Sequence, residues 1–272
     1  MSATPDTIFL VHGLWVTPRS WENWITHYEA KGFKVLAPAY PGFEIEVEAL
    51  REDPTVIAEM TIAKIVENHS KLLDELDSPP IIMGHSAGGA LTQILLDRGY
   101  GAAGVTLNSA PTEGAGKISP PSQIKATFEI LKNPTNIHKA VGFSLDQWKY
   151  AFTNGFPDEL AESTYERYHI PAPGHIIFHG VLANLQPGKQ DAYVNYKNDS
   201  RAPLLFISGT QDHIMPPSVQ QSNFKHYKSN TITEIEEFEG PHLMAAQGNW
   251  QELADRALEW ALENAGKTPV PA

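Results

Sequence analysis

The sequence has no cysteine among its 272 residues, and its basic residues are outnumbered by acidic ones. The missing cysteines exclude a disulfide framework, a thiolate nucleophile and a cysteine-ligated metal. Lysine and arginine total 20 against 32 aspartates and glutamates, which gives a formal net charge of −12. An acidic surface repels phosphate backbones, so we expect no nucleic-acid partner.

Long hydrophobic runs are also missing. The longest, residues 8–11 and 204–208, have the length of strands, whereas a bilayer-spanning helix needs about 20 apolar residues. Residues 1–6 show no basic region followed by an apolar stretch, the pattern of a signal peptide. We therefore expect a cytoplasmic protein with no membrane partner; the sequence does not indicate an oligomeric state.

Short apolar runs alternate along most of the chain with segments of helical periodicity. The expected strands are residues 8–11, 34–39, 80–83, 104–108, 204–208 and 231–238. The expected helices begin at Thr17 or cover residues 55–76, 87–97 and 251–265. This alternation predicts an α/β fold, with a mostly parallel central sheet and helices on both of its faces.

Residues 111–200 break this rhythm, since they contain helix-like pieces and many aromatic residues. A structureless loop of that length is improbable. We predict a helical cap or lid inserted into a catalytic core of residues 1–110 and 201–272. Trp148 and Phe152, four apart on one helix face, and Trp15 are candidate substrate-binding residues of a hydrophobic pocket. The alternative is that these aromatics only pack the insertion's own core.

The segment Gly84-His85-Ser86-Ala87-Gly88 follows an apolar strand and precedes a helical pattern. This G-x-S-x-G motif in a strand–turn–helix context is typical of a nucleophile elbow, which exposes the serine hydroxyl at a strained turn. Ser86 is therefore the candidate nucleophile.

A serine hydroxyl needs a base, and that base needs a carboxylate to orient it. His242 lies in a turn between the last expected strand and the last helix, which makes it the candidate base among 11 histidines. Asp212 lies in a strand-to-helix loop after residues 204–208 and is the candidate acid. We expect surface roles for four other histidines: His27, His69, His213 and His226.

Acyl transfer also needs N–H donors for the developing oxyanion. One is expected from Ala87, directly after the nucleophile, and the other from Leu14, after the tight turn that Gly13 allows. We expect His12 to order this loop through hydrogen bonds rather than act as acid or base.

Together these motifs closely resemble the α/β-hydrolase superfamily, and most of all its capped branch of lipases, esterases and perhydrolases. In such relatives a helical cap follows the sixth core strand, and residues 111–200 occupy the matching place. Relatives that cleave carbon–halogen bonds or epoxides use an aspartate nucleophile, whereas this chain has Ser86. The double glycine found after the first glycine in some lipases is replaced by Leu14-Trp15.

The leading hypothesis is a serine hydrolase that cleaves small to medium hydrophobic acyl or aryl esters, or lactones, through Ser86, His242 and Asp212. It would act on a small hydrophobic molecule and need no metal or organic cofactor. One alternative is C–C bond hydrolysis or cofactor-free peracid formation on the same triad; amide hydrolysis is another. A further alternative, from another class, is a ligand receptor that keeps the triad for slow turnover.

Overall fold

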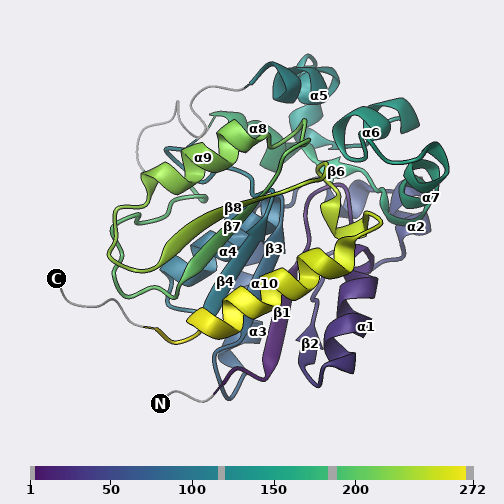
Figure 1. Ribbon diagram of the computed structural model, residues 1–272. Helices are drawn as coiled ribbons and strands as arrows, with labels where there is room; N and C mark the ends of the chain where they lie inside the picture. The colour runs from purple at the N-terminus through teal and green to yellow at the C-terminus, as the bar shows by residue number, and fades with distance from the viewer. Residues whose placement is uncertain (1–3, 116–119, 183–188, 268–272) are drawn as a thin grey trace.

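Six parallel strands form the central sheet of the computed structural model, which describes residues 4–115, 120–182 and 189–267 (Figure 1). The strands are β1 (Thr7–Val11), β2 (Lys34–Leu36), β3 (Ile81–His85), β4 (Ala103–Leu107), β7 (Leu204–Gly209) and β8 (Thr233–Phe238). Their spatial order is β2-β1-β3-β4-β7-β8, and each neighbouring pair is parallel. All the loops that follow these strands therefore leave from one edge of the sheet, where ligands of open α/β sheets bind.

Helices cover both faces of the sheet, as the alternating sequence pattern predicts (Figure 1). One face packs against α1 (Glu22–Ala30) and α10 (Trp250–Asn264). The other packs against α3 (Ile62–Asp74), α4 (Ala87–Asp97) and α9 (Pro217–His226). Successive residues of β1 alternate between these two cores, because side chains of a strand point to opposite faces.

Some expected boundaries differ from the structure. The helix expected over residues 55–76 is divided into the 3₁₀ turn η2 (Thr55–Ile57) and α3, because Thr61 caps a new helix by accepting a hydrogen bond from the N–H of Lys64. The first helix opens as the 3₁₀ turn η1 (Pro18–Trp21), capped by Thr17. The edge strand expected over residues 34–39 ends at Leu36.

We call residues 111–200, which connect β4 to β7, the inter-strand segment; its residues 116–119 and 183–188 lie outside the described structure. It contains α5 (Pro121–Leu131), η3 (Pro134–His138), β5 (Ala140–Val141), α6 (Leu145–Ala151), α7 (Asp158–Tyr168), β6 (Ala172–Pro173) and α8 (Gly174–Leu182). The short strands β5 and β6 pair only with each other, so neither extends the central sheet. Its helices α5 to α8 lie beyond the edge toward which the parallel strands run (Figure 1).

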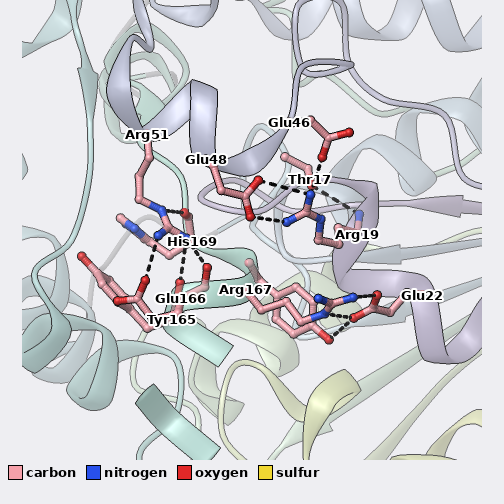
Figure 2. A network of polar contacts seen from close by, with 11 residues as sticks. Thr17, Arg19, Glu22, Glu46, Glu48, Arg51, Tyr165, Glu166, Arg167 and His169 are labelled. Carbon is pink, nitrogen blue, oxygen red and sulfur yellow. Dashed lines mark hydrogen bonds and ion pairs between the residues drawn. The ribbon is translucent and has the colours of Figure 1, made fainter. Parts of the chain in front are cut away.

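Two arginines attach α7 to the rest of the protein (Figure 2). Arg51, from α2 (Val47–Glu52), donates hydrogen bonds to the carbonyl oxygens of Tyr165, Glu166 and His169 at the end of α7. Arg167 pairs with Glu22 at the start of α1. Within the described residues, no helix combines the length and apolarity that crossing a membrane requires.

Candidate active site

Ser86 is the turn residue between β3 and α4, and its backbone is in a strained conformation. Its φ of 56° and ψ of −118° lie outside the regions that L residues favour. The N–H of Ser86 donates to the carbonyl of Leu107 at 2.9 Å, and its own carbonyl accepts from Ala110 at 2.8 Å. Strain at one residue persists only where its surroundings hold it, and such residues cluster at functional sites.

Steric crowding explains why both terminal positions of the G-x-S-x-G motif are glycine. A Cβ placed on Gly84 would lie 2.1 Å from the carbonyl oxygen of Gly88. A Cβ on Gly88 would lie 2.1 Å from the carbonyl oxygen of Val11, at the end of β1. Side chains at these positions would therefore push apart the elbow, α4 and β1.

Asp212 and His242 come together at the carboxyl edge of the sheet from different loops. Asp212 lies in the β7 loop (residues 210–216), and His242 lies in the β8 loop (residues 239–243). The Nδ1 atom of His242 is 2.7 Å from Oδ2 of Asp212, and both side chains are fully buried. The other carboxylate oxygen accepts the N–H groups of Ile214 and Met215 at 2.7 and 2.8 Å. An acceptor at Nδ1 places the proton there, which leaves Nε2 with a free lone pair.

The Nε2 atom of His242 is buried and has no hydrogen-bond partner within the described residues. It therefore makes no hydrogen bond to Ser86 in this structure; such contacts are often long before substrate binds. The residue next to the serine does reach His242. His85 donates from Nε2 to the carbonyl oxygen of His242 at 2.9 Å, and the two imidazole centroids are 4.7 Å apart.

His85 is a poor candidate base, because it is directly adjacent to Ser86 in the chain. In the structure its ring instead donates a hydrogen bond to the backbone carbonyl of His242, the expected base. Burial holds the pKa of His85 well below its ordinary value, so the imidazole is neutral and its single proton sits on Nε2. Its position inside the G-x-S-x-G motif was the only local signal for this contact.

The loop after β1 passes directly beside the elbow. A Cβ placed on Gly13 would lie 3.0 Å from the Cβ of Ser86, so any larger residue would have to push the elbow away by a few tenths of an ångström. His12 orders the loop, as expected: its ring donates to the carbonyl of Gly13 at 2.8 Å and stacks on Tyr40 with centroids 3.8 Å apart. Burial lowers the pKa of His12 to about 3, which keeps this ring neutral.

Leu14 and Ala87, the expected oxyanion donors, flank this close approach. Leu14 follows Gly13 directly, and Trp15 after it has a φ of 65°, so the loop is sharply bent. Ala87 is the first residue of α4, where helix geometry leaves an N–H without an intrahelical acceptor. Leu14 thus lies in the loop that passes Ser86, and Ala87 is the residue directly after Ser86.

The three aromatic residues expected to bind substrate form part of one ring cluster, and all are buried. Phe152 is the member that meets His242, with ring centroids 4.8 Å apart. Trp148 stacks on Phe152 at 4.2 Å, and its indole N–H points at Thr164. Trp15 packs on Phe143 and donates its indole N–H to the carbonyl of Val141.

One expectation about the other histidines is wrong. His69 was expected at the surface, but its side chain is buried between Phe9 and Tyr40, and neither ring nitrogen has a hydrogen-bond partner among the described residues. The charged residues Lys64, Glu67 and Lys71 of α3 suggested an exposed helix. His69 instead shares the buried face of α3 with Ile65 and Leu73. In the described part of the chain, no three His, Asp or Glu side chains cluster so that they could hold a metal ion.

Comparison with solved structures finds the same fold over nearly the whole chain. A monoacylglycerol lipase from Paleococcus ferrophilus aligns with a TM-score of 0.65 at 20% identity and covers 97% of both chains. A pyrethroid hydrolase from Sphingobium faniae JZ-2 gives a TM-score of 0.65 at 17% identity, over 95% of this chain and 98% of its own. An Arabidopsis methylesterase, MES16, gives 0.65 at 15%, over 93% and 98%.

No curated protein shows significant sequence similarity to the chain. Residues 8–256 nevertheless match the sequence profile described as the Alpha/beta hydrolase family, from β1 to within α10. This match covers the serine elbow, the β7 loop and the β8 loop in a single span. The chain therefore belongs to the alpha/beta hydrolase family.

Proposed function

We propose that this hydrolase cleaves carboxylic esters through an acyl-enzyme intermediate on Ser86. The observation that carries the proposal is the buried hydrogen bond between His242 Nδ1 and Asp212 Oδ2, which leaves Nε2 unpaired within the described residues; the His242 ring lies 4.7 Å from the ring of His85, the neighbour of Ser86. A neutral imidazole with a free Nε2 is what a general base requires.

In this mechanism the Ser86 hydroxyl attacks the ester carbonyl while His242 Nε2 takes its proton. Asp212 holds the ring tautomer and stabilises the imidazolium. The N–H groups of Leu14 and Ala87 bind the oxyanion of the tetrahedral intermediate. The intermediate collapses with loss of the alcohol, which receives the proton from His242. Water, deprotonated by the same imidazole, then attacks the acyl-enzyme and releases the carboxylic acid.

We further propose that the inter-strand segment acts as a helical cap that shapes the substrate site. Its residues contact two of the loops that carry the chemistry: Leu243 donates to the carbonyl of Phe152 at 2.8 Å, and Asn154 donates to the carbonyl of Gln211 at 2.6 Å. A ring cluster beside the base and a net charge of −12 both favour a neutral, apolar ester. The names of the structural relatives, a lipase, a methylesterase and a pyrethroid hydrolase, agree with ester substrates.

Within this cap, Phe152 is proposed to border the substrate directly, because it alone among the three candidate aromatics touches His242. Trp148 would support Phe152 from behind, and Trp15 would fix the loop that carries Leu14. A direct contact between substrate and either tryptophan stays a prediction.

The test is hydrolysis of 4-nitrophenyl acetate and butyrate by the wild-type protein and by Ser86→Ala. We expect kcat to fall by roughly 10⁴-fold or more in the variant, as in other triad knockouts. A fluorophosphonate should label wild type once, at Ser86, and leave the variant unlabelled. Ester turnover by Ser86→Ala at the wild-type rate would refute the mechanism.

A substrate panel separates the alternatives that share this triad. Lactones, diketones, amides and peracid formation are assayed beside the esters, with Ser86→Ala as the control. Turnover of a diketone, an amide or a peracid precursor without ester hydrolysis would replace the ester assignment while keeping Ser86 as nucleophile. Tight ligand binding without repeated turnover would indicate a receptor.

A further inference from the structure

Asn108 occupies the place at the sheet edge where the two loops of the proposed triad meet. It follows β4 directly, between β3, which leads to Ser86, and β7, which leads to Asp212. Its side chain is fully buried, and its φ of 48° lies in the left-handed region. A buried asparagine in that conformation is held there by its hydrogen bonds, because the backbone alone does not favour it.

The amide of Asn108 joins the two loops through both of its ends. Its Oδ1 accepts the N–H of Gly209, the last residue of β7, at 2.6 Å. Its Nδ2 donates to the carbonyl oxygens of Pro241 and His242 at 3.0 and 3.2 Å. One rigid planar group thereby sets the distance between the start of the β7 loop and the backbone of His242.

No other residue type of this size satisfies all three partners. An aspartate would keep an acceptor for Gly209 but would lose both donors, and leucine would lose every bond. The space is also closed, because a Cβ on Gly209 would lie 2.9 Å from Nδ2 of Asn108. His85 supplies a second donor to the same His242 carbonyl at 2.9 Å, so that carbonyl is held from two sides.

We propose that Asn108 is a positioning residue for catalysis, which holds the His242 backbone against the Asp212 loop so that Nε2 faces Ser86. This inference rests on the triad proposed above. Asn108 does not touch the reacting atoms; it acts through the placement of the base. Misplacement of a catalytic group by about 1 Å can lower a rate by about 10²-fold.

The test compares Asn108→Gly and Asn108→Asp with Thr106→Val. Glycine tolerates the left-handed backbone and deletes the amide, whereas aspartate retains only the acceptor. Thr106 lies two residues earlier on β4, is also fully buried, and donates to the carbonyl of Leu205 at 3.3 Å, away from both loops. Thr106→Val therefore measures what the loss of a buried hydrogen bond on this strand does to the fold alone.

For both Asn108 variants we expect kcat for 4-nitrophenyl butyrate to fall by about 10- to 100-fold, with KM within about twofold of wild type. The rate of fluorophosphonate labelling at Ser86 should fall in parallel, because it reports the same base. Thr106→Val should lower Tm and leave kcat and the labelling rate within about twofold.

A kcat in Asn108→Gly and Asn108→Asp no lower than in Thr106→Val would overturn the positioning role. So would a loss confined to KM. If only one Asn108 variant folds, that variant decides the question. The Ser86→Ala control keeps the two proposals apart: loss of hydrolysis in Ser86→Ala with normal kcat in the Asn108 variants refutes only this inference.

Discussion

The ring of Phe152 meets the imidazole of His242 edge-on, with centroids 4.8 Å apart and an angle of 86° between the planes. Phe152 also accepts a backbone hydrogen bond from Leu243, the residue after His242. A side chain of the inter-strand segment thus lies against the residue proposed as general base, and the two segments are tied at the same point.

Replacing Phe152 should affect both stability and substrate preference. Phe152→Ala should cost about 3–5 kcal/mol of unfolding free energy, because a fully buried ring is removed. Phe152→Leu retains most of the volume and should cost less than about 1.5 kcal/mol. Its activity on 4-nitrophenyl esters from acetate to decanoate should shift in chain-length preference relative to wild type.

Trp148→Phe is the matched control for Phe152→Leu, since Trp148 stacks on Phe152 without touching His242. If Trp148→Phe shifted the chain-length profile as strongly, Trp148 would itself border the substrate, as the sequence analysis predicted. An unchanged profile in Phe152→Leu would remove Phe152 from the substrate site.

Gly88→Ala should unfold the elbow rather than impair chemistry alone. The added Cβ would lie 2.1 Å from the carbonyl oxygen of Val11 and 2.6 Å from that of His12, and backbone cannot move aside cheaply. We expect more than about 4 kcal/mol of destabilisation or no soluble protein. Gly180→Ala is the control, because no atom of the described residues lies within 4 Å of its added Cβ; by circular dichroism its Tm should equal or exceed that of wild type. A Gly88→Ala protein with wild-type Tm would contradict the packing described.

Arg51→Lys should loosen the attachment of α7, since a lysine cannot replace the guanidinium that donates to several carbonyls at once. Hydrogen bonds from charged donors contribute about 1.5–3 kcal/mol, so urea denaturation should reveal a loss of about that size. Arg19→Lys serves for comparison: its carboxylate partners Glu46 and Glu48 are 77% and 65% exposed, and it should lose less than about 1 kcal/mol. Equal losses in the two variants would mean that the carbonyl contacts of Arg51 add nothing.

His69 should make the protein less stable in mild acid. Burial lowers its pKa to about 4 in the folded state, against about 6.5 in the unfolded chain. Between these values the unfolded state binds more protons, so stability falls as pH drops through 6.5 toward 4, by up to about 1.4 kcal/mol per pH unit for this residue.

The measurement is urea denaturation of wild type and His69→Leu from pH 5 to 8. The variant should show a shallower loss of stability below pH 6.5. Toward pH 8, where the imidazole is neutral in both states, it should differ from wild type by a constant. Identical slopes for the two proteins would show that His69 does not take up a proton on unfolding.

The positions of Ser86, Asp212 and His242 at one sheet edge could be predicted because each follows an expected strand, and parallel strands end together. The bond between His242 and Asp212 follows from the same logic. The contacts of Asn108 could not be predicted, since its partners lie more than 100 residues away and nothing local marks them. The burial of His69 could not be predicted for a related reason. Charged residues near it in the sequence are exposed, whereas His69 lies on the buried face of the same helix.

Residues near the two ends of the inter-strand segment contact each other beside the sheet. The hydroxyl oxygens of Thr112 and Tyr196 are 2.8 Å apart, and the N–H of Glu113 donates to the carbonyl of Ala192 at 2.9 Å. A segment whose ends are already clasped can change in length at little entropic cost, because closure entropy grows only with the logarithm of loop length. This stretch can therefore be exchanged as a unit, and we expect a laboratory graft from a relative to test the proposed cap role by altering the substrate range while the sheet is inherited unchanged.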